Sequence, residues 1–159
     1  VDEAVSNESG AELHADWGHH ITFGEPFLKP GVVLALPGAQ HRRFTMPPRG
    51  TPGGFEAIGL GDLAEGSYRL TDESSGIGAR IDWDAAVWPY VWFWRDFGAD
   101  YSPPYYGRHY NVGLELFTSP PAQTLEDNIR AGTALRFGAY ETRQARLSFT
   151  VLHHARTEG

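Results

Sequence analysis

The chain has 159 residues, 19 glycines, 11 prolines and no cysteine, and its formal net charge is −7. This length allows a sizeable hydrophobic core, so we expect residues 1–159 to form a single domain. The negative charge disfavours nucleic acid and anionic membranes as partners, and no apolar run reaches the roughly 18 residues of a membrane helix. The lack of cysteine excludes disulfides and thiolate metal sites and fits a reducing cytoplasm, which is the expected compartment.

Short apolar or alternating runs, separated by turn residues, predict strands along most of the chain. In chain order these are Val1–Val5, Ala11–Trp17, Val32–Leu36, Tyr68–Thr71, Ile77–Trp83, Tyr90–Arg95, Tyr110–Phe117 and Ala145–Leu152. Residues 24–31 and 47–54 are rich in glycine and proline and predict loops. This succession of short strands indicates an all-β fold, an antiparallel β-sandwich or barrel.

One short helix is predicted near residues 124–131. Thr124 can cap its first turn, where Glu126 and Asp127 favour the positive end of the helix. Gly132 stands where a left-handed terminator belongs. No other segment keeps a helical period for long.

The segment from Tyr110 to Phe117 carries the most informative pattern. Its apolar residues would face one side of a strand, whereas Asn111, Gly113 and Glu115 would face the other. A carboxylate in mid-strand is costly to bury without a task or a partner, and the glycine beside it leaves room. We therefore predict a ligand site over this face of the sheet, with Glu115 beneath the ligand.

Two adjacent histidines are the second candidate. Because neighbouring residues of a strand point to opposite faces, only one of His19 and His20 can face a given cleft. A histidine opposed to a carboxylate across that cleft would form an acid–base pair. The alternative is that both imidazoles are half-buried and hydrogen-bonded to the backbone.

Aromatic residues alternate along one face of the segment that follows. Rings with polar tips are good platforms for the apolar faces of sugars, although the core of a sandwich also accepts them. We assign Trp92 to the core. We take Trp94 and His19 as candidate substrate-binding residues, and a core position is the alternative for Trp94.

The order and spacing of several short motifs resemble the C-terminal portion of the aldose 1-epimerase, or galactose mutarotase-like, family. Asn7 lies in a turn after the first strand, and residues 20–23, His-Ile-Thr-Phe, are similar to the family's His-x-Tyr-Phe element. Residues 113–118, Gly-Leu-Glu-Leu-Phe-Thr, are similar to its glutamate-bearing strand. Residues 125–137 are similar to its closing segment. Thr22 departs from the family's tyrosine, and Gly24 replaces an asparagine that often follows the phenylalanine.

The resemblance implies a galactose mutarotase-like β-sandwich, present as a partial supersandwich, and an isomerase that interconverts sugar anomers. By position, Glu115 would take the proton from the anomeric hydroxyl and His20 would protonate the ring oxygen. The ring would then open, rotate about C1–C2 and close as the other anomer, with a small-molecule sugar as ligand and no metal or organic cofactor.

The family's N-terminal part, which supplies an arginine and another histidine to the sugar pocket, is missing from this sequence. We therefore expect the chain by itself to expose strand edges and apolar faces. The missing N-terminal portion, or a second copy of the chain in a homo-oligomer, would cover them.

Two other functions stay open. A non-catalytic carbohydrate-binding β-sandwich would use the same aromatic face without acid–base chemistry. A cupin-like metal-binding barrel is the other possibility, because the imidazoles of His19 and His20 and the carboxylate of Glu25 suit a divalent metal. Cupins, however, bring two histidines to one face by a His-x-His pair, and here the histidines are adjacent.

Overall fold

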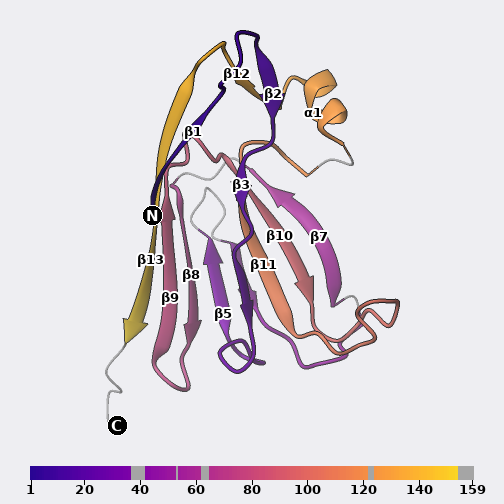
Figure 1. The fold of residues 1–159 in the computed structure, drawn as a ribbon. Coiled ribbons are helices and arrows are strands. Elements are labelled where there is room, and N and C mark those ends of the chain that lie inside the picture. Colours follow the sequence, from indigo (N-terminus) through magenta and orange to yellow (C-terminus); the bar gives the residue numbers. More distant parts are fainter. Residues whose placement is uncertain (37–41, 53, 62–64, 122–123, 154–159) are drawn as a thin grey trace.

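The computed structural model describes residues 1–36, 42–52, 54–61, 65–121 and 124–153, and antiparallel strands are its main secondary structure (Figure 1). One sheet has the order β1 (Asp2–Ser6), β13 (Thr142–His153), β9 (Ile77–Trp83), β8 (Ser67–Asp72), β5 (Val33–Leu36) and β6 (Arg42–Thr45). The other has the order β3 (Gly18–His19), β11 (Asn111–Phe117), β10 (Tyr90–Asp96) and β7 (Phe55–Leu60), and β4 (Thr22–Gly24) also pairs with β11. β2 (Leu13–Ala15) and β12 (Leu135–Phe137) form a small separate sheet at one end. The predicted antiparallel β-sandwich is therefore confirmed.

The predicted strands are all present, although the second shrinks to the three residues of β2. The described residues of 24–31 and 47–54 contain only the last residue of β4 and otherwise no strand, as predicted. Five short strands, β3, β4, β6, β7 and β12, were not predicted. They have two to six residues each, so alternation is too brief or too weak to mark them in the sequence.

The predicted helix is α1 (Leu125–Ala131), which Thr124 caps. The Thr124 side chain accepts a hydrogen bond from the backbone N–H of Asp127, and the Asp127 carboxylate accepts one from the backbone N–H of Thr124. Gly132 ends the helix at φ 72°, a left-handed conformation that glycine adopts readily. No helix among the described residues has the length and apolar character needed to cross a bilayer.

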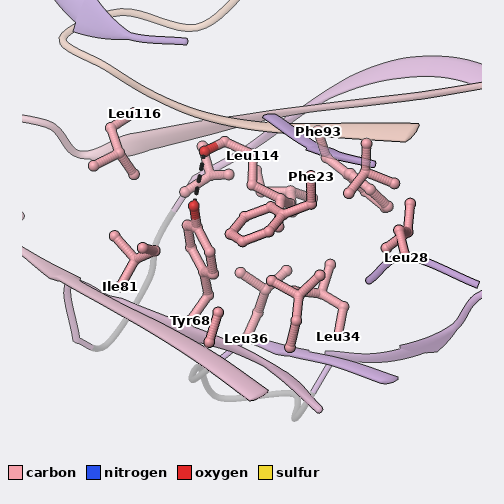
Figure 2. Close-up of a cluster of buried hydrophobic side chains, with 14 of the residues drawn as sticks. Phe23, Leu28, Leu34, Leu36, Tyr68, Ile81, Phe93, Leu114 and Leu116 are labelled. Carbon is pink, nitrogen blue, oxygen red and sulfur yellow. Dashed lines mark hydrogen bonds between the residues drawn. The ribbon is translucent and has the colours of Figure 1, made fainter. Parts of the chain in front are cut away.

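The hydrophobic core lies between the two large sheets (Figure 2). Leu114 and Leu116 of β11 and Leu34, Leu70 and Ile81 of the facing sheet are fully buried. Between them, the Tyr68 hydroxyl donates a hydrogen bond to the Leu114 carbonyl at 3.2 Å, which links the two sheets through the core. This packing fixes one face of β11 inside the sandwich and turns its other face outward.

One edge of the larger sheet, along the second half of β13, has no neighbouring strand in the described part of the chain. β1 pairs with the first half of β13, and Val1 exchanges hydrogen bonds with Leu147. Beyond Leu147 the strand pairs only with β9. Phe149 and Val151 of this second half are 56% and 57% exposed, and Ile77 is 39% exposed. The expected exposure of a strand edge and of apolar side chains is therefore found here.

Candidate functional site

Glu115 lies in mid-strand on the outward face of β11 and is nevertheless 6% exposed. Its carboxylate lies directly above Gly113, since a Cβ atom at that glycine would stand 2.5 Å from Oε1 of Glu115. The room that the glycine leaves is thus occupied by the glutamate itself. The absence of a side chain at position 113 allows the carboxylate to lie there.

His20 meets this carboxylate from the neighbouring edge of the sheet. His19 pairs with Leu116 and Thr22 pairs with Gly113, so the short connection between β3 and β4 passes beside Glu115. Nε2 of His20 lies 2.9 Å from Oε1 of Glu115. The imidazole is 69% exposed, so it stands at the mouth of the site with the carboxylate on its floor.

Thr22 holds the other nitrogen of the imidazole. Its Oγ1 lies 3.1 Å from Nδ1 of His20. When His20 carries its proton on Nε2, the Thr22 hydroxyl can donate to Nδ1, and the imidazole is then oriented by one contact at each nitrogen. The residue that replaces the family's tyrosine therefore has a direct part in positioning His20.

Burial controls the electrostatics of Glu115. Removal from water raises the pKa of the Glu115 carboxyl above its usual 4.5, and the charge of a protonated His20 offsets part of this shift. The two contributions have opposite signs, and burial is the larger. A carboxylate with a raised pKa holds protons more strongly than an ordinary glutamate, which improves it as a proton acceptor.

These residues line a cleft of about 400 Å³ on the outward face of the five-stranded sheet. Its full lining is His20, Thr22, Trp92, Phe93, Trp94, Tyr105, His109, Asn111, Glu115 and Pro121. The cross-strand pairs Trp92–Glu115 and Trp94–Gly113 place both tryptophans on the same face as the carboxylate. A volume of this size with apolar walls and a few polar groups is typical of small-molecule sites.

Both tryptophans of this face line the cleft, and only Trp92 differs from its predicted position. Trp94 lines the cleft beside Tyr105, with the ring centroids 6.0 Å apart. The assignment of Trp92 to the core is wrong, because it also lines the cleft and stacks on Phe117 with the centroids 3.8 Å apart. Its Nε1 donates to the Ser119 carbonyl at 2.7 Å. Alternation along β10 instead sends Val91 and Phe93 into the core.

His19 lies away from the cleft, on the other side of the strand. Its Nε2 is 2.7 Å from Oε1 of Glu3, and its ring packs edge-on against Trp88, which is in the core. Only His20 of the two histidines reaches the cleft, as strand geometry requires. The structure does not bring His19 to the predicted site.

The residues that invited a cupin-like metal site are dispersed. His19 contacts Glu3, His20 contacts Glu115, and Glu25 forms an ion pair with Arg49 at 2.9 Å. In the described part of the chain, no three histidine or acidic side chains converge as metal ligands would. The two large sheets also form a sandwich, which differs from a cupin barrel.

Asn7, one of the residues behind the resemblance, has a structural position. It is 3% exposed, and its Nδ2 donates to the carbonyls of Ala11 and Gly138, both at 2.8 Å. Its Oδ1 accepts from the backbone N–H of Ser9 at 2.9 Å. Asn7 thus ties the turn after β1 to the turn before β13, outside the cleft.

Besides Thr22 and Trp92, three lining residues with polar side chains were not predicted as site residues: Tyr105, His109 and Asn111. Tyr105 and His109 belong to the loop between β10 and β11, and their rings meet edge to face at 5.2 Å. The density of tyrosines in this loop was the available signal. Asn111 shares the face of Glu115, as its even spacing along β11 indicates, and its Oδ1 is buried without a hydrogen-bond partner among the described residues.

Several solved structures with the same fold are described as members of the expected family. Two proteins described as putative aldose 1-epimerases match, one from Klebsiella pneumoniae at a TM-score of 0.78 and 16% identity and one from Escherichia coli K12 at 0.63 and 15%. A galactose mutarotase-like protein from Lactobacillus casei matches at 0.61 and 16% identity. These matches cover 94–96% of this chain but 42–57% of the other chains. No family model and no curated protein matches the sequence.

At these identities the likeness defines the fold and leaves the activity open. The chain has a galactose mutarotase-like β-sandwich fold, as the sequence motifs predicted. It spans about half the length of the structures named above.

Proposed function

We propose that the cleft binds a sugar in its cyclic form and that Glu115 and His20 interconvert the two anomers. The observation that carries this proposal is the 2.9 Å contact between His20 Nε2 and Glu115 Oε1, two residues 95 positions apart that meet inside a sugar-sized cleft. Anomer exchange needs one base and one acid at a single carbon, because the anomeric hydroxyl and the ring oxygen are both bonded to C1. Two groups in direct contact can both reach the two oxygens of C1 once the substrate has displaced the contact between them.

The proposed reaction moves two protons and breaks one bond. Glu115, ionised, accepts the proton of the C1 hydroxyl while protonated His20 donates to the ring oxygen, so the C1–O5 bond breaks and C1 becomes a carbonyl carbon. Rotation about C1–C2 presents the opposite face of the carbonyl. Return of both protons then closes the ring as the other anomer and restores the resting pair.

The remaining walls supply binding and orientation. Trp92 and Trp94 offer flat apolar surface on which a pyranose ring can stack. Asn111 and His109 add hydrogen-bonding groups at the end of the cleft next to the β10–β11 loop. The pairing of one apolar platform with few polar groups suits a neutral sugar, and the net charge of −7 disfavours an anionic one.

A second candidate function is sugar binding without catalysis. The aromatic lining of the cleft supports it, since stacking surfaces serve binding whether or not protons move. Calorimetric titration with glucose or galactose and a measured rate of anomer exchange separate the two. Saturable binding without acceleration above the spontaneous rate selects the binding function.

Polarimetry of freshly dissolved α-D-glucose and α-D-galactose tests the catalytic proposal. Glu115→Gln keeps the size of the side chain and removes the base, and His20→Ala removes the acid. Each is expected to lower the catalysed rate by about 10²–10⁴-fold, the usual contribution of one general acid or base. Undiminished catalysis in Glu115→Gln would refute the assignment of this residue.

The chain provides matched controls for both variants. His19 and Glu3 form a second histidine–glutamate pair, 2.7 Å apart, outside the cleft. His19→Ala therefore removes an imidazole one residue from His20 but on the far side of the strand, and Glu3→Gln removes the carboxylate that contacts it. Both are expected to retain the wild-type rate if the cleft is the site of reaction.

The compartment and the partners follow as further parts of the proposal. A cysteine-free chain fits a reducing cytoplasm, which subcellular fractionation can check. The open edge of β13 and the exposed Phe149 and Val151 fit a contact with the remainder of a longer fold or with a second copy of the chain. Sedimentation at several protein concentrations measures any self-association.

A further inference from the structure

The loop between β10 and β11 carries more exposed aromatic surface than the cleft uses. Tyr105 lines the cleft, but Tyr101 and Tyr106 of the same loop are 74% and 54% exposed. Large aromatic side chains in such positions remain in contact with water in the free protein. Where they adjoin a binding cleft, they are candidates for contact with a ligand.

The backbone of this loop is held in place by its own hydrogen bonds. The Tyr105 and Tyr106 N–H groups donate to the Ser102 carbonyl at 2.8 and 3.0 Å, and the Gly107 N–H donates to the Asp100 carbonyl at 2.7 Å. Nη1 of Arg49 donates to the carbonyls of residues 108 and 109, at 3.3 and 3.1 Å. Rings on a fixed backbone bind with a smaller entropy cost than rings on a mobile one.

The positions of both exposed rings are specified locally. Tyr101 lies over Gly107, where an added Cβ would stand 2.8 Å from the ring, and Gly107 itself has φ +68°. Tyr106 has φ +53°, a left-handed conformation that costs a non-glycine residue free energy. The Arg108 guanidinium lies 5.8 Å from the centroid of its ring. The loop thus keeps a strained tyrosine at the surface, where core packing does not require it.

The charges around the loop favour a neutral ligand. Arg49, the cation that holds the loop, is paired with Glu25 at 2.9 Å. Arg108 lies over the face of Tyr106, and Asp100 lies within the same loop and accepts the Ser102 N–H at 2.8 Å. The surface is therefore aromatic and of mixed charge, which suits the apolar faces and hydroxyls of a sugar better than a phosphate or a carboxylate.

We propose that Tyr101 and Tyr106 form a second saccharide subsite, continuous with the cleft through Tyr105. The ligand would then be a neutral saccharide of two or more residues, with its reducing-end ring in the cleft and the next ring on these tyrosines. This inference rests on the proposed function, because it assumes that a reducing-end sugar occupies the cleft.

Calorimetric titrations with glucose, maltose and cellobiose test the subsite. Tyr101→Ala removes one ring, and Tyr106→Asn removes the other with a residue that tolerates a left-handed backbone. Tyr140→Asn is the matched control, because Tyr140 is 73% exposed, has φ +56° and lies in the turn before β13, away from the cleft.

The wild-type protein is expected to bind at least one disaccharide more tightly than glucose. Each subsite variant is expected to lower the ratio of disaccharide to glucose affinity by about two- to tenfold, the value of one aromatic contact. The control is expected to leave that ratio unchanged.

Three results would overturn the subsite. They are equal affinity of the wild-type protein for the three sugars, an unchanged ratio in both subsite variants, and an equal fall of the ratio in the Tyr140→Asn control. In each case binding or anomer exchange of glucose shows that the proposed function survives. Failure of the wild-type protein to bind or convert any of the sugars removes both proposals together.

Discussion

Replacement of Gly113 by alanine tests whether activity depends on the position of the Glu115 carboxylate, because it changes none of the residues that line the cleft. The added Cβ would stand 2.5 Å from Oε1 of Glu115 and 3.3 Å from its Cδ. Since Cβ contacts in proteins essentially never fall below 3.0 Å, Oε1 has to move by at least about 0.5 Å. A displacement of this kind changes the distance from Glu115 both to His20 and to the substrate.

The expected cost in rate follows from this displacement. A misplacement of about 1 Å in a catalytic group can cost roughly 100-fold, so we expect about a tenfold or greater loss of catalysed anomer exchange. The fold is expected to hold, because Gly113 lacks the positive φ that disfavours other residues. Alanine in a strand is also more favourable than glycine by about 0.5–1 kcal/mol. Activity would therefore fall while the free energy of unfolding stays constant or rises.

Polarimetry gives the rate of the Gly113→Ala variant, and urea denaturation gives its stability. Gly24→Ala is the control, because Gly24 pairs with Asn111 in the same sheet and an added Cβ there meets its nearest neighbour at an ordinary 3.8 Å. Wild-type activity in Gly113→Ala would show that the carboxylate does not need this position. A loss of activity that merely follows a loss of stability would also refute the reasoning.

Two further predictions concern the same pair. Because burial raises the pKa of Glu115 above 4.5, its ionisation costs native stability as pH rises from 4.5 through the native pKa. Urea denaturation across this range should therefore show that the free energy of unfolding of Glu115→Gln increases relative to that of the wild type as pH rises. The wild-type activity should fall at acid pH with a midpoint above pH 4.5. A midpoint at or below pH 4.5 would contradict the raised pKa of Glu115. Thr22→Val, which removes the hydroxyl near His20 Nδ1, should lower the rate about five- to tenfold, the value of one hydrogen bond, whereas Thr22→Ser should retain it. Equal rates for the valine and serine variants would show that His20 is oriented without this contact.

The sequence was most informative where a regular pattern is long. The alternation of residues 111–117 correctly separates the core face of β11 from the face that carries Glu115, and the capping residues Thr124 and Gly132 mark both ends of α1. These signals are local, since each depends on the geometry of one strand or one helix. The partnership of His20 and Glu115 is not local, and it was proposed from the resemblance of motif order to a family.

The predictions that failed or were incomplete involve contacts between segments. Trp92 has the same alternation whether its face is covered by a second sheet or left open as a cleft, so its sequence position could not separate the two environments. His109 reaches the cleft through the conformation of an irregular loop, for which no periodic signal exists. His19 is turned from the cleft because Glu3 and Trp88 hold it on the other side.

The hydrogen bond that the Tyr68 hydroxyl donates to the Leu114 carbonyl connects the core to the residue next to Glu115. Residues that pack in the core and residues that face the cleft therefore alternate along a single strand, β11. A register slip of one residue would exchange the two sets, sending the carboxylate inward and leucines into the cleft. A substitution that changes the volume of the core beneath β11 is thus expected to move the cleft residues as well. Directed evolution of this protein would therefore have to optimise core packing and cleft geometry together.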